Sequence, residues 1–364
     1  MSLTRRVGMF FLLGAAAVAL GEPIYTIIDL GVAGVGANGL NNAGDVAGNL
    51  PSSSCAGLSF CGFIRYSNGQ TTILGALPGG TNSTATAIND AGQVVGASGT
   101  MPFLYSNGQM TSLDLLPGAD HGVAFAINNG GQAVGYSRGS TGSYAMLWSN
   151  GQMTSFGMPG DLTGATDIND SGEVVGGSAF RGAFLYSNGQ ITWLGTMIAL
   201  VAINNGSQAV GAGGPNNTAQ AVLYSNGQMT SLGTLPGDTT SLARNINNEG
   251  QVVGVSELLN NQNNPERAFL YSSGTMYDLN DLIVDGSGWT LETAWDINDS
   301  SQIIGNGTFN NQSHSFLLTP VQSAVPEPAS IILCTTALIV GLAFVRGRRC
   351  RDSFNGRKDR SLRG

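Results

Sequence analysis

The sequence predicts an all-β fold, a seven-bladed β-propeller built from four-stranded blades. Three observations predict it: a short phrase recurs seven times, a second phrase with a hairpin signal alternates with it, and the two ends of the repeat region complement each other. The seven copies are separated by 35 to 51 residues, a period typical of solenoids, propellers and arrays. The third observation favours a closed ring over a linear solenoid.

The first phrase is residues 88–96 (INDAGQVVG). Apolar residues flank an Asn/Asp turn in which Gly92 supplies an unusual backbone angle, so the phrase predicts strand, turn and strand. Versions of it begin at Leu40, Ile88, Ile127, Ile168, Ile203, Ile246 and Ile297.

The second phrase is residues 184–190 (FLYSNGQ). It recurs at residues 63–70, 103–109, 146–152, 222–228 and, weakened, 269–275. Asn-Gly between alternating apolar residues is a strong hairpin signal, because a type I′ turn needs a positive φ at both central residues. Each unit therefore holds four strands, which in the second unit we expect at residues 85–89, 93–97, 102–106 and 109–113. Four strands in about 40 residues make one propeller blade.

The two ends of the repeat region share one blade. The seventh unit has three expected strands, at residues 293–297, 302–305 and 313–318, and lacks a fourth. Fourth strands elsewhere end in Leu-Gly, and residues 25–31 (YTIIDLG) supply such a strand. We expect the N-terminal strand to complete the last blade, which closes the ring and removes exposed sheet edges.

The repeat resembles the HAF family of extracellular repeats, whose units carry the same order of Ala-Phe-Leu, Asn-Gly, Leu-Gly and Ile-Asn. The similarity extends over about residues 25–318. It implies an extracellular location and a repeat architecture, and it implies no activity.

Charge is sparse and unevenly placed. Charged residues make up 10% of the chain, and the region between Arg6 and Arg346 has five arginines, no lysine and 21 acidic residues, a net charge of −16. Such a region repels nucleic acid and favours cations. We therefore expect no nucleic-acid partner.

Both ends of the chain carry features of an exported protein. Residues 1–21 have a basic start, an apolar run and small residues, as in a signal peptide, with an uncleaved anchor as the alternative. After the propeller region, 22–319, we expect a linker at 320–328, a hydrophobic anchor helix at 329–345 and a basic cytoplasmic tail at 346–364. The residues that define this end are Val325, Pro326, Glu327, Pro328, Arg346, Arg348 and Arg349.

This C-terminal arrangement resembles the PEP-CTERM sorting signal. The resemblance implies processing by an exosortase-like enzyme, a Gram-negative producer and association with exopolysaccharide or the outer envelope. The chain continues for 15 residues after the arginine cluster, which departs from the pattern of that signal. An ordinary membrane anchor is the alternative, so whether the anchor is cleaved stays open.

Few residues suggest a chemical role. Cys55 and Cys61 lie close together, and in an oxidising compartment they are expected to form a disulfide. His121 and His314 are expected to be loop residues, because neither belongs to a metal-spaced cluster. Trp289 lies in or beside a variable loop and is the candidate for stacking on a sugar. No cofactor is expected, although the turn at residues 169–173 offers oxygen ligands that leave calcium open.

The connections between strands 2 and 3, and from each strand 4 to the next strand 1, vary widely within the chain. Variable loops on a rigid scaffold commonly carry binding sites. We therefore expect a non-catalytic surface protein that binds polysaccharide or envelope components through the face that carries these loops. The alternative is a secreted propeller enzyme acting on glycans, with loop carboxylates as acid and base. The variable segments are 49–62, 136–144, 212–220, 257–267, 280–291 and 306–314.

Overall fold

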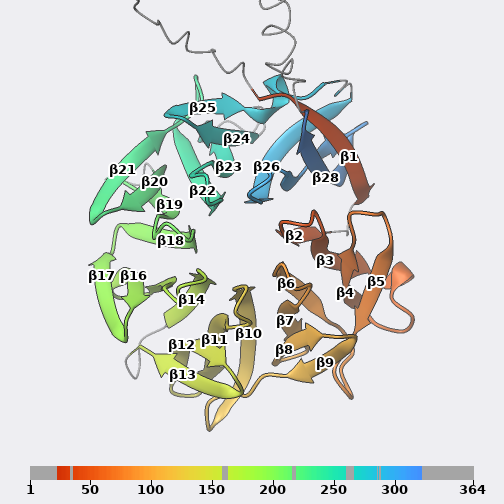
Figure 1. Cartoon of the computed structure of the whole chain (residues 1–364), viewed down its shortest axis with the longest axis vertical. Helices are drawn as coiled ribbons and strands as arrows, with labels where there is room; N and C mark the ends of the chain where they lie inside the picture. The colour runs from red at the N-terminus through yellow and green to blue at the C-terminus, as the bar shows by residue number, and fades with distance from the viewer. Residues whose placement is uncertain are drawn as a thin grey trace, which may run out of the picture. The chain divides into compact units, whose positions relative to one another are not determined.

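The computed structural model describes residues 23–32, 36–157, 163–214, 219–259, 266–284, 286 and 288–321. These residues form seven four-stranded antiparallel sheets arranged as blades around a central axis (Figure 1). Two short 3-10 turns, Ser52–Ser54 and Leu279–Asp281, are the only helical elements of the described residues. The predicted seven-bladed β-propeller is confirmed.

In each blade the strands run in chain order from the axis to the rim, with β1 outermost in the last blade. The innermost strands are β2 (Gly36–Leu40), β6 (Thr84–Ile88), β10 (Ala119–Ile127), β14 (Thr163–Ile168), β18 (Ile198–Ile203), β22 (Thr240–Ile246) and β26 (Trp289–Ile297). The second strands are β3 (Val46–Pro51), β7 (Val94–Ser98), β11 (Ala133–Gly139), β15 (Val174–Ser178), β19 (Ala209–Gly213), β23 (Val252–Glu257) and β27 (Ile303–Phe309). The third strands are β4 (Phe60–Arg65), β8 (Met101–Ser106), β12 (Gly142–Ser149), β16 (Gly182–Ser187), β20 (Gln220–Ser225), β24 (Arg267–Ser272) and β28 (Gln312–Pro320). The outermost strands are β5 (Thr71–Gly75), β9 (Gln109–Ser112), β13 (Gln152–Phe156), β17 (Gln190–Gly195), β21 (Gln228–Gly233), β25 (Thr275–Asp278) and β1 (Tyr25–Val32). Blades 1 to 6 start at β2, β6, β10, β14, β18 and β22, and blade 7 is β26, β27, β28 and β1.

Ring closure occurs where the sequence predicts it. β1 pairs antiparallel with β28, from Tyr25 opposite Pro320 to Val32 opposite His314. Tyr25 also donates its backbone N–H to Leu282 and accepts from Val284, so the closing strand is held on two sides. The N-terminal strand therefore completes blade 7 (Figure 1).

Two kinds of turn lie on one face of the ring, which we call the amide face. The hairpins between third and fourth strands have a positive φ at both central residues, for example Asn188 (52°) and Gly189 (80°), as the type I′ signal predicts. The first copy differs: Gly69 has a φ of 87°, whereas Asn68 does not adopt a positive φ. The turns between first and second strands lie on the same face. We call the opposite face, which carries the variable connections, the loop face.

Every innermost strand contains a β-bulge at the same place, a feature that was not expected from the sequence. In β14 the register shifts between Ala165 and Asp167, so Thr166 has no partner residue on β15. At the bulge the first strand comes close to the second strand, and in every blade the second strand has a glycine at this point. A Cβ on Gly176 would lie 2.2 Å from the carbonyl oxygen of Gly164. The unpaired bulge residues are Asn38, Thr86, Phe125, Thr166, Val201, Arg244 and Trp295.

Apolar packing joins neighbouring blades rather than filling one central core. One cluster, for example, brings Val134 of blade 3 together with Ala165 and Phe184 of blade 4. The tyrosines of the second phrase pack against these clusters, as expected for core residues rather than sugar platforms; they are Tyr66, Tyr105, Tyr186 and Tyr224. The rigidity of the ring therefore depends on contacts between blades.

Several expectations concern residues at the ends of the chain. The signal peptide, and the C-terminal linker, anchor helix and basic tail that follow residue 321, lie outside the described residues, as do Val325, Pro326, Glu327, Pro328, Arg346, Arg348 and Arg349. In the part of the chain that the structure describes, we find no helix with the length and apolar character needed to cross a membrane.

Candidate functional site

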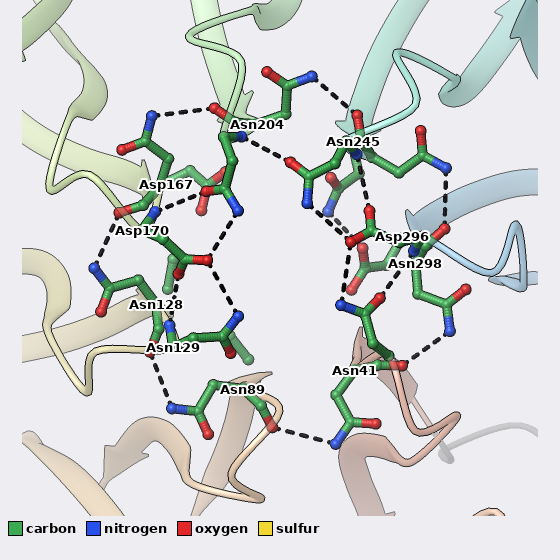
Figure 2. A pocket seen from close by; sticks show the side chains of 18 of the residues that line it. Asn41, Asn89, Asn128, Asn129, Asp167, Asp170, Asn204, Asn245, Asp296 and Asn298 are labelled. Atoms are coloured by element: carbon green, nitrogen blue, oxygen red, sulfur yellow. Dashed lines mark hydrogen bonds between the residues drawn. The ribbon is translucent and has the colours of Figure 1, made fainter.

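The axis of the propeller holds a cavity of about 190 Å³ that is lined by all seven blades (Figure 2). Its lining comes from the first phrase, because each innermost strand ends at the axis with an Ile-Asn or Leu-Asn pair. Three tiers of polar side chains lie along the cavity. We call them the amide ring, the mouth ring and the floor, and define each below.

The amide ring consists of seven buried asparagines: Asn41, Asn89, Asn128, Asn169, Asn204, Asn247 and Asn298. Each donates Nδ2–H to the backbone carbonyl of the ring asparagine in the next blade, at 2.9 to 3.2 Å, and Asn298 donates to Asn41 (Figure 2). The hydrogen bonds thus form a closed circle that links every blade to the next.

An asparagine side chain satisfies every polar partner at this position, as Asn204 illustrates. Its Oδ1 accepts the backbone N–H groups of Gly206 and Gln208, both at 3.0 Å, which shapes the turn. Its Nδ2 donates to the Gln208 side chain and to the Asn247 carbonyl, both at 3.0 Å. The side chain needs two acceptor lone pairs and two N–H donors at once, which an amide supplies and a carboxylate does not.

The mouth ring consists of the next residue in each blade: Asn42, Asp90, Asn129, Asp170, Asn205, Asn248 and Asp299. Each backbone N–H bonds to the side-chain Oδ1 of the next blade's residue at 2.8 to 3.0 Å, which closes a second circle. The second oxygen of each aspartate accepts N–H groups from neighbouring asparagines; Asp170, for example, accepts from Asn205 at 2.8 Å. This ring faces solvent on the amide face.

The floor of the cavity consists of Asp167, Asn245 and Asp296. Asp167 accepts N–H groups from Ile168 and from Ile203 of the next blade, at 2.8 and 2.7 Å. Asp296 does the same with Ile297 and with Leu40 of blade 1, at 2.8 and 2.7 Å. Each carboxyl is enclosed by protein but keeps part of its surface open to the cavity.

Burial dominates the electrostatics of these two carboxyls. Desolvation raises the pKa of Asp167 and of Asp296 to about 7, although the backbone N–H groups favour the charged form. The negative charge of Asp296 adds to the rise for Asp167. Blades 2, 3 and 5 have alanine at this strand position, namely Ala87, Ala126 and Ala202.

The raised pKa values predict a pH dependence of stability. A carboxyl that binds its proton more tightly in the folded state loses folding stability as the pH rises from about 4, its unfolded pKa, to about 7. The double variant Asp167→Ala and Asp296→Ala, which copies the alanine found at this position in blades 2, 3 and 5, lacks this loss. The melting temperature of the natural chain relative to the variant should therefore fall between pH 4 and 7. A constant difference across that range would contradict the prediction.

The calcium alternative gains no support from the geometry. The Glu173 carboxylate accepts from Ser207, Asn169 and Ser187 at 2.6 to 3.0 Å, and Asn169 Oδ1 caps the turn. Burial acts to raise the pKa of Glu173, but these three hydrogen bonds outweigh it and the net pKa is lowered. Among the described residues no group of three His, Cys, Asp or Glu side chains could hold a metal ion.

Two of the unpaired bulge residues are exposed aromatic rings, which lie one residue upstream of the cavity lining. Trp295 is 38% exposed, donates Nε1–H to Asn306, and has the Arg244 guanidinium 4.7 Å from its ring centre. Phe125 is likewise 38% exposed and lies 5.6 Å from the ring of Tyr136. Together with Phe60, the first residue of β4 at the loop face, and Phe180, on the connection between β15 and β16, these are the exposed phenylalanine and tryptophan side chains of the described residues.

The cysteines and the tryptophan that the sequence singles out differ in burial and packing. Cys55 and Cys61 form a disulfide of 2.05 Å in blade 1, and both are buried. Trp289 is only partly buried but lies flat against Phe309 at 4.9 Å and edge-on to Phe316, so it packs within blade 7. Trp295, which was not singled out from the sequence, has the greater exposure.

The expectation that the histidines are loop residues is wrong. His121 belongs to β10 and bonds through Nδ1 to the Tyr136 hydroxyl at 3.1 Å. His314 belongs to β28, is buried, and its Nδ1 lies 2.9 Å from an oxygen of Asp29 on the closing strand β1. Segments 136–144 and 306–314, expected as loops, are mostly strand, because β11, β12, β27 and β28 extend into tight hairpins.

Fold and axial site define a class of protein: a seven-bladed β-propeller whose blades are joined by circles of asparagine and aspartate side chains. The family model described as "Protein of unknown function (DUF3466)" matches residues 119–315. That match covers more than half of the chain, and the chain belongs to this family. No curated protein matches it.

Solved structures with a similar fold are distant in sequence. "YCF48 bound to D1 peptide" has a TM-score of 0.50 at 12% identity and covers 82% of this chain and 97% of its own. TolB from Acinetobacter baumannii has 0.40 at 11%, with 77% and 64% covered. A gluconolactonase from Xanthomonas campestris has 0.41 at 10%, with 84% and 93% covered. At 12% identity the similarity to the first of these structures shows the fold alone.

Proposed function

We propose that this protein is an exported, non-catalytic propeller that binds polysaccharide or another envelope component through its loop face. The C-terminal features at residues 325–349 support export and sorting by an exosortase-like enzyme, with the membrane as a transient or lasting anchor. The HAF-like repeats support an extracellular or cell-surface location in a Gram-negative bacterium. Both arguments rest on the sequence.

The distribution of exposed aromatic rings is the observation that supports the choice of face. On the amide face, the side chains of the repeated turns bond to one another across blades, which leaves few of their polar groups for a ligand. The exposed ring of Phe180 lies on the connection between β15 and β16 on the loop face, and that of Phe60 lies at the start of β4 on the same face. The rings of Phe125 and Trp295 lie at the bulges. Aromatic rings of this kind stack on the apolar faces of sugars, and a neighbouring cation and amide can bond to hydroxyl groups.

The aromatic platform at Trp295 gives a direct test. Trp295→Ala should weaken retention of the chain on its producer's exopolysaccharide about tenfold, because the stacking surface is lost. The measurement is co-sedimentation of the full chain with the polysaccharide. Trp289→Phe serves as the control, because Trp289 packs inside blade 7, and its retention should equal that of the natural chain. If the control loses retention and Trp295→Ala keeps it, the site lies at Trp289.

The alternative is an enzyme that acts on glycans. Asp167 and Asp296 are two carboxyls with raised pKa values, a property shared with general acids. Their oxygens, however, accept backbone N–H groups that join neighbouring blades, which is a structural role. We therefore propose binding without turnover.

A further inference from the structure

Blade 6 shows how a turn can seat against the blade that follows it. The connection from β21 to β22 contains Leu235 and Pro236. Leu235 is buried in the same apolar cluster as Phe269, and its N–H bonds to Ser256 Oγ at 3.1 Å. Arg267 donates to the Pro236 carbonyl at 2.9 Å. The side chains of Ser256 on β23 and of Arg267 and Phe269 on β24 thus hold one Leu-Pro turn.

The same seat is occupied in two other blades. Leu77 N–H bonds to Ser98 Oγ in blade 2 at 3.0 Å, and Leu116 N–H bonds to Ser137 Oγ in blade 3 at 3.1 Å. Both leucines pack on the apolar clusters beside them. A leucine followed by proline is therefore the natural occupant of this seat.

Blade 5 has the seat without the turn. Only Thr196 and Met197 connect β17 to β18, so no Leu-Pro turn is present. The counterparts of Ser256, Arg267 and Phe269 are Gly213, Gln220 and Val222, each of which is a smaller residue.

All three of these residues line a cavity of about 590 Å³. Its remaining wall includes Ile198 and two methionines, Met197 and Met229, and Met197 is 59% exposed. Methionine side chains adapt their shape to different ligands, which suits a binding surface.

We propose that this cavity binds a leucine-containing polypeptide segment of a partner protein, seated as Leu235 and Pro236 are seated in blade 6. The apolar wall takes the leucine side chain. Gln220, whose oxygen accepts from Ser231 at 2.6 Å, offers its amide N–H where Arg267 offers a guanidinium. Arg267 also forms an ion pair with Asp238 of the turn at 2.9 Å, and a neutral Gln220 removes the need for that acidic residue. The partner segment is therefore apolar and uncharged at this point.

A synthetic peptide with the sequence of residues 233–240 and asparagine in place of Asp238 (GTLPGNTT) is the probe. It is titrated to about 1 mM into the full chain carrying labelled methionine methyl groups, observed by NMR. We expect the signals of Met197 and Met229 to shift. Met110, the counterpart of Met229 in blade 2, should not shift, because the seat there is filled by Leu77.

Two matched controls test the seat itself. The same peptide with serine in place of leucine should bind at least tenfold more weakly. Gly213→Leu, whose Cβ would lie 3.4 Å from Ile198 and 3.5 Å from Val222, should fill the cavity and also weaken binding at least tenfold, while the other methionine signals show an intact fold.

Three outcomes would overturn the proposal: no shift at that concentration, equal binding by Gly213→Leu, or equal binding by the serine peptide. If a fatty acid shifts the NMR signals of Met197 and Met229 and the peptide does not, the cavity would be assigned to a lipid chain. None of these readouts involves polysaccharide, so the result is independent of the proposed function.

Discussion

Gly176→Ala is expected to lower the free energy of unfolding by about 3 kcal/mol, at the upper end of the usual cost of overpacking. The new Cβ would lie 2.2 Å from the Gly164 oxygen and 2.6 Å from a ring carbon of Phe184. Neither neighbour can move freely, because one is backbone of β14 paired with β15 and the other is a buried core ring. The measurement is urea unfolding followed by tryptophan fluorescence.

The adjacent glycine supplies the control. Gly177→Ala places its Cβ no nearer than 3.9 Å to any atom, and Gly177 does not adopt a positive φ. It should leave stability unchanged or raise it by about 0.5 kcal/mol, through the entropy of the unfolded chain. Equal losses for the two variants would mean that the bulge does not require glycine on the second strand.

Asn204→Ala is expected to cost about 3 kcal/mol as well, because it removes four hydrogen bonds at a buried position. Two backbone N–H groups of the turn and the carbonyl of the buried Asn247 lose a partner, and the circle of asparagines is opened between blades 5 and 6. Thermal unfolding of the full chain measures the loss.

The exposed neighbour of Asn204 separates the amide ring from the mouth ring. Asn205→Ala removes bonds to Asp170 at 2.8 and 2.9 Å, but water reaches this position and replaces them. We expect a loss of about 1 kcal/mol or less. A loss at Asn205 as large as at Asn204 would contradict the assignment of blade linkage to the amide ring.

Local signals explain why the fold could be predicted. Asn-Gly gives the two positive φ angles of a type I′ turn in four of its five copies, and the recurrence of Ile-Asn indicates the number of blades. The expected strands 85–89, 93–97, 102–106 and 109–113 agree within one residue at either end with β6, β7, β8 and β9. The closing strand was predictable because the seventh repeat lacks a fourth strand and the N-terminal segment, residues 25–31, supplies one.

The bulges and the side-chain circles could not be read from the chain. A bulge is set by how a first strand meets its neighbours, and its only trace in the sequence is the glycine of the Val-Val-Gly segment. Six of the seven pairs of amide-ring partners are separated by 35 to 51 residues and the seventh, Asn298 with Asn41, by 257, so the partners meet only in the folded ring. Arg244 and Trp295 belong to different blades and form no recognisable motif in the sequence. The sequence points to Trp289 instead, because Trp289 lies beside a variable loop.

The most direct test of the proposed function measures retention and turnover together. The full chain is incubated with the producer's exopolysaccharide, and both the retained protein and the released reducing ends are quantified. We expect retention without release, as for a non-catalytic binding propeller. Release of reducing ends would contradict this account, and would make Asp167 and Asp296 the first carboxyls to replace.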